Sequence, residues 1–181
     1  ALDQHELRDL DAGSVRAFIS TVGQDAKLFQ RSLAFNVTLG NPAISDAQVL
    51  QALELANATH ILNKLPDGIH SELNQFGQQL SAGEAQLISF ARALASPAPL
   101  VLLDEATANI DTLNEHAIQK ATQNLLKQRS VIVIAHRLST IQHADTIIAL
   151  RDGKIIEHGS HADLMAIENG FYAKLYSMGL H

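Results

Sequence analysis

The chain has 181 residues, of which 46% are hydrophobic, so it can bury a sizeable core in one domain, with room for a subdomain. Its net charge of −6 provides no basic field for nucleic acid, and the absence of cysteine excludes disulfides and cysteine-based metal sites. No apolar run approaches the ~20 residues of a membrane span, and no signal peptide opens the chain. Because the sequence begins at Ala1 without an initiator Met, we expect a fragment of a longer protein.

The first elements expected are an irregular polar segment and a strand. Residues 1–17 are polar, and residues 18–22 have the composition of a strand. Gln24 follows at the end of that strand. A glutamine in this place is usually a loop amide, but its carbonyl oxygen can also coordinate a metal ion.

Residues 45–95 are expected to be mainly helical. Ser45 and Gln48 match a capping box that begins a helix, and Pro66-Asp67-Gly68 gives a turn signal. Segments with α/β character precede and follow this stretch. The shift in composition predicts an inserted helical subdomain.

A second capping box, formed by Ser81 and Glu84, begins the helix expected over residues 81–94. Gly83 lies in its first turn, where glycine costs helix stability but lets a ligand approach the free amides. Those amides, the helix dipole and the Ser81 hydroxyl can form an anion site. An ordinary capped helix is the alternative interpretation.

Residues 100–103 are four apolar residues that predict a strand buried on both faces of a parallel sheet. Asp104 and Glu105 follow at its carboxyl end, where α/β sheets place their ligands. The pair suits Mg²⁺ binding by the first carboxylate and water activation by the second. The alternative is a strand that ends in a solvated acidic loop.

The remaining chain predicts further α/β elements. A helix is expected from Thr112, and a second buried strand over residues 131–135 delivers His136 at its carboxyl end. Residues 146–157 predict a hairpin that turns at Arg151-Asp152-Gly153-Lys154. A short helix from Ser160 and a final helix follow.

Taken in this order, the motifs resemble the ATP-binding cassette of ABC transporters over nearly the whole chain. The segments that carry the resemblance are residues 18–28 (the Q-loop region), 80–84 (the signature motif), 100–111 (the Walker B strand and D-loop) and 131–136 (the switch-histidine strand). Residues 135–141, 144–145 and 152–161 are similar to exporter cassettes, and residues 171–176 look like the usual end of such chains. Gln86-Leu87 and residues 108–111 look like multidrug-type half-transporters, including ones that pair as heterodimers.

The resemblance implies an α/β fold: a P-loop NTPase (RecA-like) core formed by residues 1–40 and 97–181, with residues 41–96 as the helical subdomain. It also implies a transmembrane domain on the same polypeptide and pairing with a second cassette. The cassette itself is then expected at the cytoplasmic face of the inner membrane. The phosphate-binding motif G-x-x-x-x-G-K-[ST] does not occur in the sequence, so we expect it upstream of Ala1. The 181 residues alone are expected to hydrolyse almost no ATP.

The site residues implied by the resemblance are taken from its motifs, with ATP and Mg²⁺ as the bound groups. Glu105 is the general base, His136 contacts the γ-phosphate, and Asp104 and Gln24 bind Mg²⁺. The nucleotide held by the partner cassette is contacted by the start of the signature helix, that is, by Ser81, Ala82, Gly83 and Glu84. Asp111 connects the two sites.

Two departures from the family pattern stand in the sequence. Glu84 replaces the usual Gln of the signature, and its charge is expected to repel a γ-phosphate held nearby. Asn74-Gln75 replaces the Gly-Glu that normally contacts the transmembrane domain. Two other functions stay open: a soluble ABC-type ATPase acting on nucleic acid or ribosomes, and a regulatory cassette that does not hydrolyse ATP. The acidic charge disfavours the first, and the presence of Glu105 and His136 disfavours the second.

Overall fold

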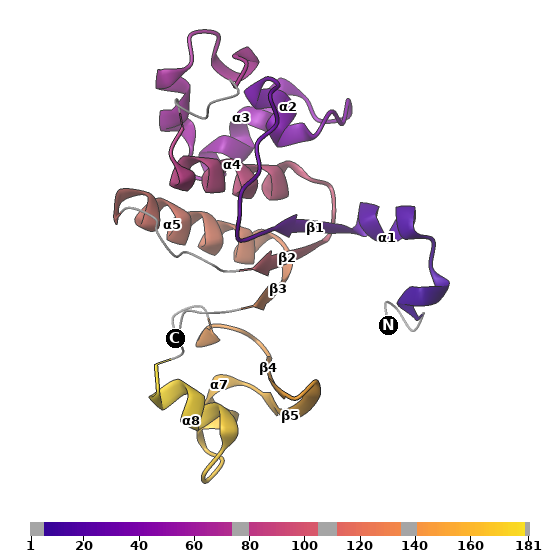
Figure 1. Cartoon of the computed structure of the whole chain (residues 1–181), viewed down its shortest axis with the longest axis vertical. Coiled ribbons are helices and arrows are strands. Elements are labelled where there is room, and N and C mark those ends of the chain that lie inside the picture. Colours follow the sequence, from indigo (N-terminus) through magenta and orange to yellow (C-terminus); the bar gives the residue numbers. More distant parts are fainter. Residues whose placement is uncertain (1–5, 74–79, 105–111, 135–140, 180–181) are drawn as a thin grey trace. The chain divides into compact units, whose positions relative to one another are not determined.

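The computed structural model describes residues 6–73, 80–104, 112–134 and 141–179 (Figure 1). Contacts within the chain divide it into two compact units, Ala1–Val133 and Ile134–His181, and each unit is described by itself. The division between a core and a helical subdomain at residues 41–96 stays a prediction.

The N-terminal segment contains helix, so the expectation of an irregular start was wrong. A 3-10 turn, η1 (Leu7–Asp9), precedes helix α1 (Ala12–Phe18). The cause is a local cap: the Asp11 carboxylate accepts a hydrogen bond of 2.8 Å from the Ser14 N–H, which satisfies one of the free donors of the first turn. This bond also lowers the pKa of Asp11.

The sheet of the first unit contains β1 (Ile19–Val22), β2 (Leu100–Asp104) and β3 (Ser130–Ile134), in that spatial order. Strands β1 and β2 run parallel, with Val22 opposite Leu103. The carboxyl ends of these two strands therefore lie at one edge of the sheet.

The strands are buried on one face of the sheet, not on both as expected. In β2, Val101 and Leu103 belong to the hydrophobic core, but Leu102 between them is 36% exposed. In β3, Ile132 and Ile134 are more than half exposed. Because side chains alternate between faces, an unbroken apolar run is compatible with one covered face when helices pack on that face only.

In the described part of the chain between the adjacent strands β1 and β2, there are five helical elements. They are α2 (Leu33–Thr38), α3 (Asp46–Leu55), η2 (Thr59–Lys64), η3 (Gly68–His70) and α4 (Ala82–Ala95). Helix α5 (Thr112–Gln128) comes after β2, and α4 packs against α2, α3 and α5 (Figure 1). Fully buried side chains at the centre include Val22, Leu53, Leu87, Ile88, Phe90, Val101 and Leu125.

Local signals explain where these helices begin. The capping boxes predicted at Ser45/Gln48 and Ser81/Glu84 are both present. The apolar side chains of Leu87, Ile88, Ala91 and Leu94 on α4 are buried. On α3, Val49 and Leu53 are fully buried and Leu50 is 45% exposed.

The second unit is a hairpin packed with two short helices. Strands β4 (Ile147–Arg151) and β5 (Lys154–Gly159) pair antiparallel, as predicted. Asp152 and Gly153 both have positive φ, the backbone of a type I′ turn. Helices α7 (His161–Met165) and α8 (Phe171–Ser177) follow, and the first residues of α8 donate their N–H groups to the Glu157 carboxylate.

No helix in the described parts of the chain is both long enough and apolar enough to cross a membrane.

Candidate functional site: strand ends and the start of helix α4

The first part of the candidate site lies at the carboxyl ends of β1 and β2. Asp104 is the last residue of β2 and is half-buried. Gln24 is exposed in the bend two residues after β1. Because Val22 and Leu103 are partners in the parallel ladder, both predicted metal ligands follow paired positions at one sheet edge.

Helix α4 contacts this edge through a residue that the sequence analysis did not select for a role. The Gln86 side chain is 6% exposed, and its Nε2 donates to the carbonyl oxygen of Gly23 at 3.1 Å. Gly23 precedes Gln24 directly, so α4 is tied to the loop that carries the predicted metal ligand. The glutamine has no local sequence signal, because its partner lies 63 positions earlier in the chain.

The second part of the candidate site is the N-terminus of α4. Ser81 caps the helix: its Oγ accepts from the Glu84 N–H at 3.2 Å, and the Glu84 Oε2 accepts from the Ser81 N–H at 2.8 Å. Among the described residues, the N–H groups of Ala82 and Gly83 have no hydrogen-bond acceptor. An exposed serine hydroxyl and two free amides therefore lie at the positive end of a 14-residue helix, which favours an anion.

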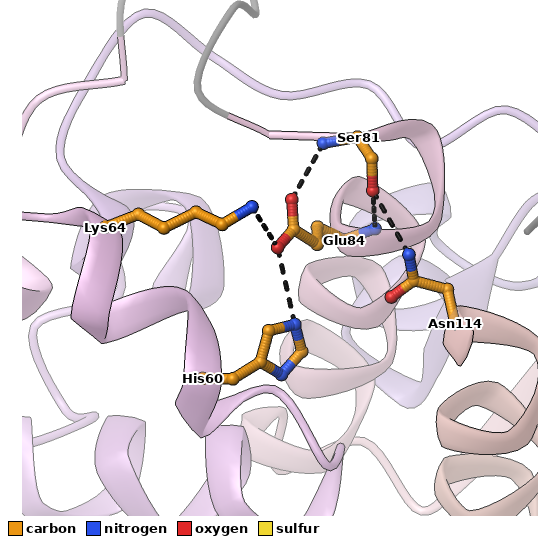
Figure 2. Close-up of polar contacts among 5 residues, drawn as sticks. All are labelled: His60, Lys64, Ser81, Glu84 and Asn114. Carbon is orange, nitrogen blue, oxygen red and sulfur yellow. Dashed lines mark hydrogen bonds and ion pairs between the residues drawn. The ribbon is translucent and has the colours of Figure 1, made fainter.

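The Glu84 carboxylate contacts Lys64, His60 and Ser81 (Figure 2). Its side chain is 4% exposed, and its Oε1 lies 2.8 Å from Lys64 Nζ and 3.4 Å from His60 Nε2, both on η2. Burial by itself raises the pKa of Glu84, but the Lys64 hydrogen bond, the Ser81 N–H and the charges of Lys64 and His60 lower that pKa below its ordinary value overall.

This arrangement bears on the expected effect of the glutamate. From the sequence, the negative charge of Glu84 is expected to repel a γ-phosphate held nearby. In the structure, Lys64 balances that charge at 2.8 Å, and both carboxylate oxygens face protein donors. The sequence does not show that η2 places a lysine beside α4, and the expected repulsion of a phosphate stays a prediction.

Gly83 has a structural reason to be glycine. A Cβ atom at this position would lie 2.5 Å from the Cβ of Asn114 on α5, far inside normal contact. The glycine thus permits the close approach of α4 and α5. Asn114 also donates from Nδ2 to Ser81 Oγ at 3.3 Å (Figure 2), a contact that no sequence motif indicates.

Three predicted site residues lie outside the described residues: Glu105, Asp111 and His136. Their roles stay predictions.

The side-chain oxygens at the described strand ends are compatible with Mg²⁺ binding. In the described ranges there is no group of three or more His, Asp or Glu that could enclose a metal ion. Mg²⁺ does not require one, because it commonly keeps several waters and takes one or two protein oxygens together with phosphate oxygens. A carboxylate at Asp104 and an amide oxygen at Gln24, on neighbouring strand ends, match that requirement.

Comparisons with known proteins agree on one family. A family model described as "ABC transporter" matches residues 1–108. The chain is 44% identical over 177 residues to an ATP-dependent lipid A-core flippase of Bordetella pertussis, a match that covers 97% of this chain and 28% of that protein. It is 38% identical over 177 residues to ABC transporter B family member 14 of Arabidopsis thaliana, covering 98% of this chain and 14% of that protein.

A solved structure gives the same result in three dimensions. The structure of a bacterial Atm1-family ABC exporter with ATP bound matches 92% of this chain and 29% of its own, with a TM-score of 0.77 and 37% identity. The α/β fold of a P-loop NTPase, expected from the sequence, is thereby confirmed. The chain spans less than a third of the length of each of these relatives.

Proposed function

This chain belongs to the ABC transporter family, and we propose that it is the ATP-binding and ATP-hydrolysing domain of an exporter. In this proposal a transmembrane domain lies on the same polypeptide, and the chain lies at the cytoplasmic face of the cell (inner) membrane. Two cassettes, identical or different, close around ATP and Mg²⁺, and hydrolysis powers the transport of a substrate.

The observation that carries the ATPase proposal is the placement of Asp104 and Gln24 at one sheet edge, with Gln86 joining that edge to α4. The names of the relatives support export, because they include a flippase and an exporter. The matches to the flippase and to the exporter structure cover 97% and 92% of this chain.

The predicted residues have complementary tasks. Asp104 and Gln24 hold Mg²⁺, which supplies positive charge to the phosphate oxygens when it is bound. Glu105 accepts the proton of the attacking water, and His136 donates to the γ-phosphate. These groups act by positioning and charge stabilisation around an in-line transfer, as in other phosphoryl-transfer enzymes.

The start of α4 serves the nucleotide held by the second cassette. The Ser81 hydroxyl and the free N–H groups of Ala82 and Gly83 contact the γ-phosphate of that nucleotide. Glu84 acts indirectly, because its carboxylate is used to hold Ser81 and Lys64. Asp111 connects the two sites.

The test is the variant Glu105→Gln in the full transporter polypeptide that carries this chain. We expect this variant to bind ATP and to hydrolyse it at least ~100-fold more slowly, because general-base catalysis contributes about 10²–10⁴-fold. ATP binding is followed by retention of labelled nucleotide, and hydrolysis by phosphate release.

A matched control is Glu54→Gln, which makes the same charge change at an exposed position of α3. The control should hydrolyse ATP at the parental rate. Normal turnover by Glu105→Gln would refute the base assignment, and a parental protein without ATPase activity would refute the hydrolytic function itself.

A further inference from the structure

The hydroxyl oxygen of Ser81 accepts two hydrogen bonds from inside the protein. One comes from the Glu84 N–H at 3.2 Å and the other from Asn114 Nδ2 at 3.3 Å (Figure 2). A serine hydroxyl has two acceptor lone pairs and one donor hydrogen. Both acceptor positions are therefore occupied, and the remaining capacity of this exposed group is to donate.

The described ranges contain two other serine capping boxes, and these differ from the Ser81 box in this respect. Ser45 Oγ donates to Gln48 Oε1 at 3.0 Å, and Ser160 Oγ donates to Asp163 Oδ2 at 2.6 Å. In both boxes the hydroxyl hydrogen is used within the cap. No corresponding bond joins Ser81 Oγ to the Glu84 carboxylate among the described contacts.

The Glu84 carboxylate also differs from its two counterparts in its other contacts. In the ordinary boxes, one oxygen of Gln48 or Asp163 accepts from both the serine N–H and the serine hydroxyl. Glu84 Oε2 accepts from the Ser81 N–H only, and Oε1 lies beside Lys64 and His60 on η2. Among the described ion pairs, none holds the side chain of Gln48 or Asp163 in this way.

We propose that Asn114, together with the Lys64–Glu84 ion pair, is a positioning device that keeps the Ser81 hydroxyl as an outward hydrogen-bond donor to an anionic oxygen of bound ATP. Asn114 supplies the second internal donor, and Lys64 holds the Glu84 carboxylate through Oε1, the oxygen that does not bind the Ser81 N–H. The inference rests on the proposed function, because it takes the acceptor to be a phosphate oxygen.

Gly83 is part of the same device. A Cβ atom there would lie 2.7 Å from Asn114 Cγ and 2.8 Å from Asn114 Nδ2, so any other residue would displace the amide group from Ser81. A glycine in the first turn costs helix stability, and this close contact gives a reason for its presence. It admits the side chain that orients the serine.

The variant Asn114→Asp tests the direction of the bond, because it keeps the shape of the side chain and replaces the donor by an acceptor. The Ser81 hydroxyl then donates inward, and its bond to ATP is lost. The measurement is the Kd for ATP of the full transporter polypeptide in the Glu105→Gln background, where bound ATP persists. We expect the Kd to rise by about tenfold or more, since a hydrogen bond to a charged group contributes about 1.5–3 kcal/mol.

Asn114→Asp also adds a negative charge, so the same substitution is made in a Ser81→Ala background. If Asn114 acts through the serine, Asn114→Asp has almost no further effect there. A tenfold rise in Kd that persists without the hydroxyl would show plain charge repulsion and would overturn the proposal. The variant Asn114→Leu removes the donor without adding an acceptor. Its Kd for ATP should lie between the Kd of the parental protein and that of Asn114→Asp. A Kd equal to that of Asn114→Asp would also overturn the proposal.

Asn124→Asp is the matched control, because Asn124 lies on the same helix and its Nδ2 donates to the Leu55 carbonyl, not to Ser81. It should leave the Kd unchanged. A control that raises the Kd as much as Asn114→Asp does would overturn the specific role. Failure of the proposed function can be told apart from failure of this inference. If the proposed function fails, the parental protein shows no ATPase activity. If only this inference fails, that activity is intact and Asn114→Asp leaves the Kd for ATP unchanged.

Discussion

Glu84 is a nearly buried carboxylate whose charge is balanced by one half-exposed lysine. The Glu84 side chain is 4% exposed and the Lys64 side chain 49% exposed. Exposed ion pairs contribute less than about 1 kcal/mol, while breaking a fully buried pair costs about 3–5 kcal/mol. This pair lies between the two cases, so its contribution to stability should also be intermediate.

We expect Lys64→Met to lower the free energy of unfolding at neutral pH by about 1–2 kcal/mol, because a largely buried carboxylate loses its counter-charge. Adding Glu84→Gln should recover most of the loss, since an amide needs no counter-charge. Urea denaturation measures all three proteins. Lys120→Met, at an exposed position of α5, is the control and should change little; an equal loss in this control would contradict the ion-pair explanation.

The pH dependence of this effect has a definite sign. The pKa of Glu84 is lowered in the folded state from its ordinary value of 4.5, so the ion pair contributes fully above that value. The contribution is lost as the pH falls through the lowered pKa. The stability difference between the parental protein and Lys64→Met should therefore be constant near neutrality and shrink below pH 4.5. A difference that grows on acidification would refute this assignment.

At the scale of elements, α4 is the helix that joins the parts of the first unit. Gln86 binds the carbonyl of Gly23, and Arg92 binds the carbonyls of Lys27 and Asn36 at 3.2 and 2.9 Å. Burial lowers the pKa of Arg92. One helix thus holds both ends of the loop that carries Gln24, while its own N-terminus presents Ser81.

Gln86→Leu removes one of these attachments at similar volume. We expect a loss of about 1 kcal/mol in unfolding free energy, typical of one hydrogen bond, and a several-fold lower ATP turnover in the full transporter, because the loop with Gln24 loses its fixed end. Gln51→Leu, at an exposed position of α3, should change neither quantity. If turnover stays at the parental rate while stability falls, the attachment has a structural role only.

At the scale of the whole molecule, the 181 residues contain the proposed metal-binding strand ends and the capped start of α4, but their sequence has no G-x-x-x-x-G-K-[ST] motif. That motif supplies the backbone amides and the lysine that hold the phosphates. We expect a purified protein of these 181 residues to bind ATP weakly and to show negligible hydrolysis in a phosphate-release assay. Measurable turnover by this protein would contradict the expectation.

The sequence by itself determined the features that depend on neighbouring residues. The capping boxes at Ser45 and Ser81, the hairpin turn at Asp152-Gly153 and the parallel strand ending at Asp104 all follow from short patterns, because caps and turns are made by groups within four positions of one another. The family was also recognisable from the order of its motifs, and the comparisons confirm it.

Only the tertiary structure decided which distant side chains meet. Lys64 beside Glu84, Asn114 beside Ser81 and Gln86 beside Gly23 are separated in sequence by 20, 33 and 63 positions. The same holds for the sheet, where an apolar run predicted two buried faces and the packing of helices covers one. Such contacts depend on how the elements pack, which is a property of the whole core. The sequence around either residue therefore contains no signal that predicts the contact.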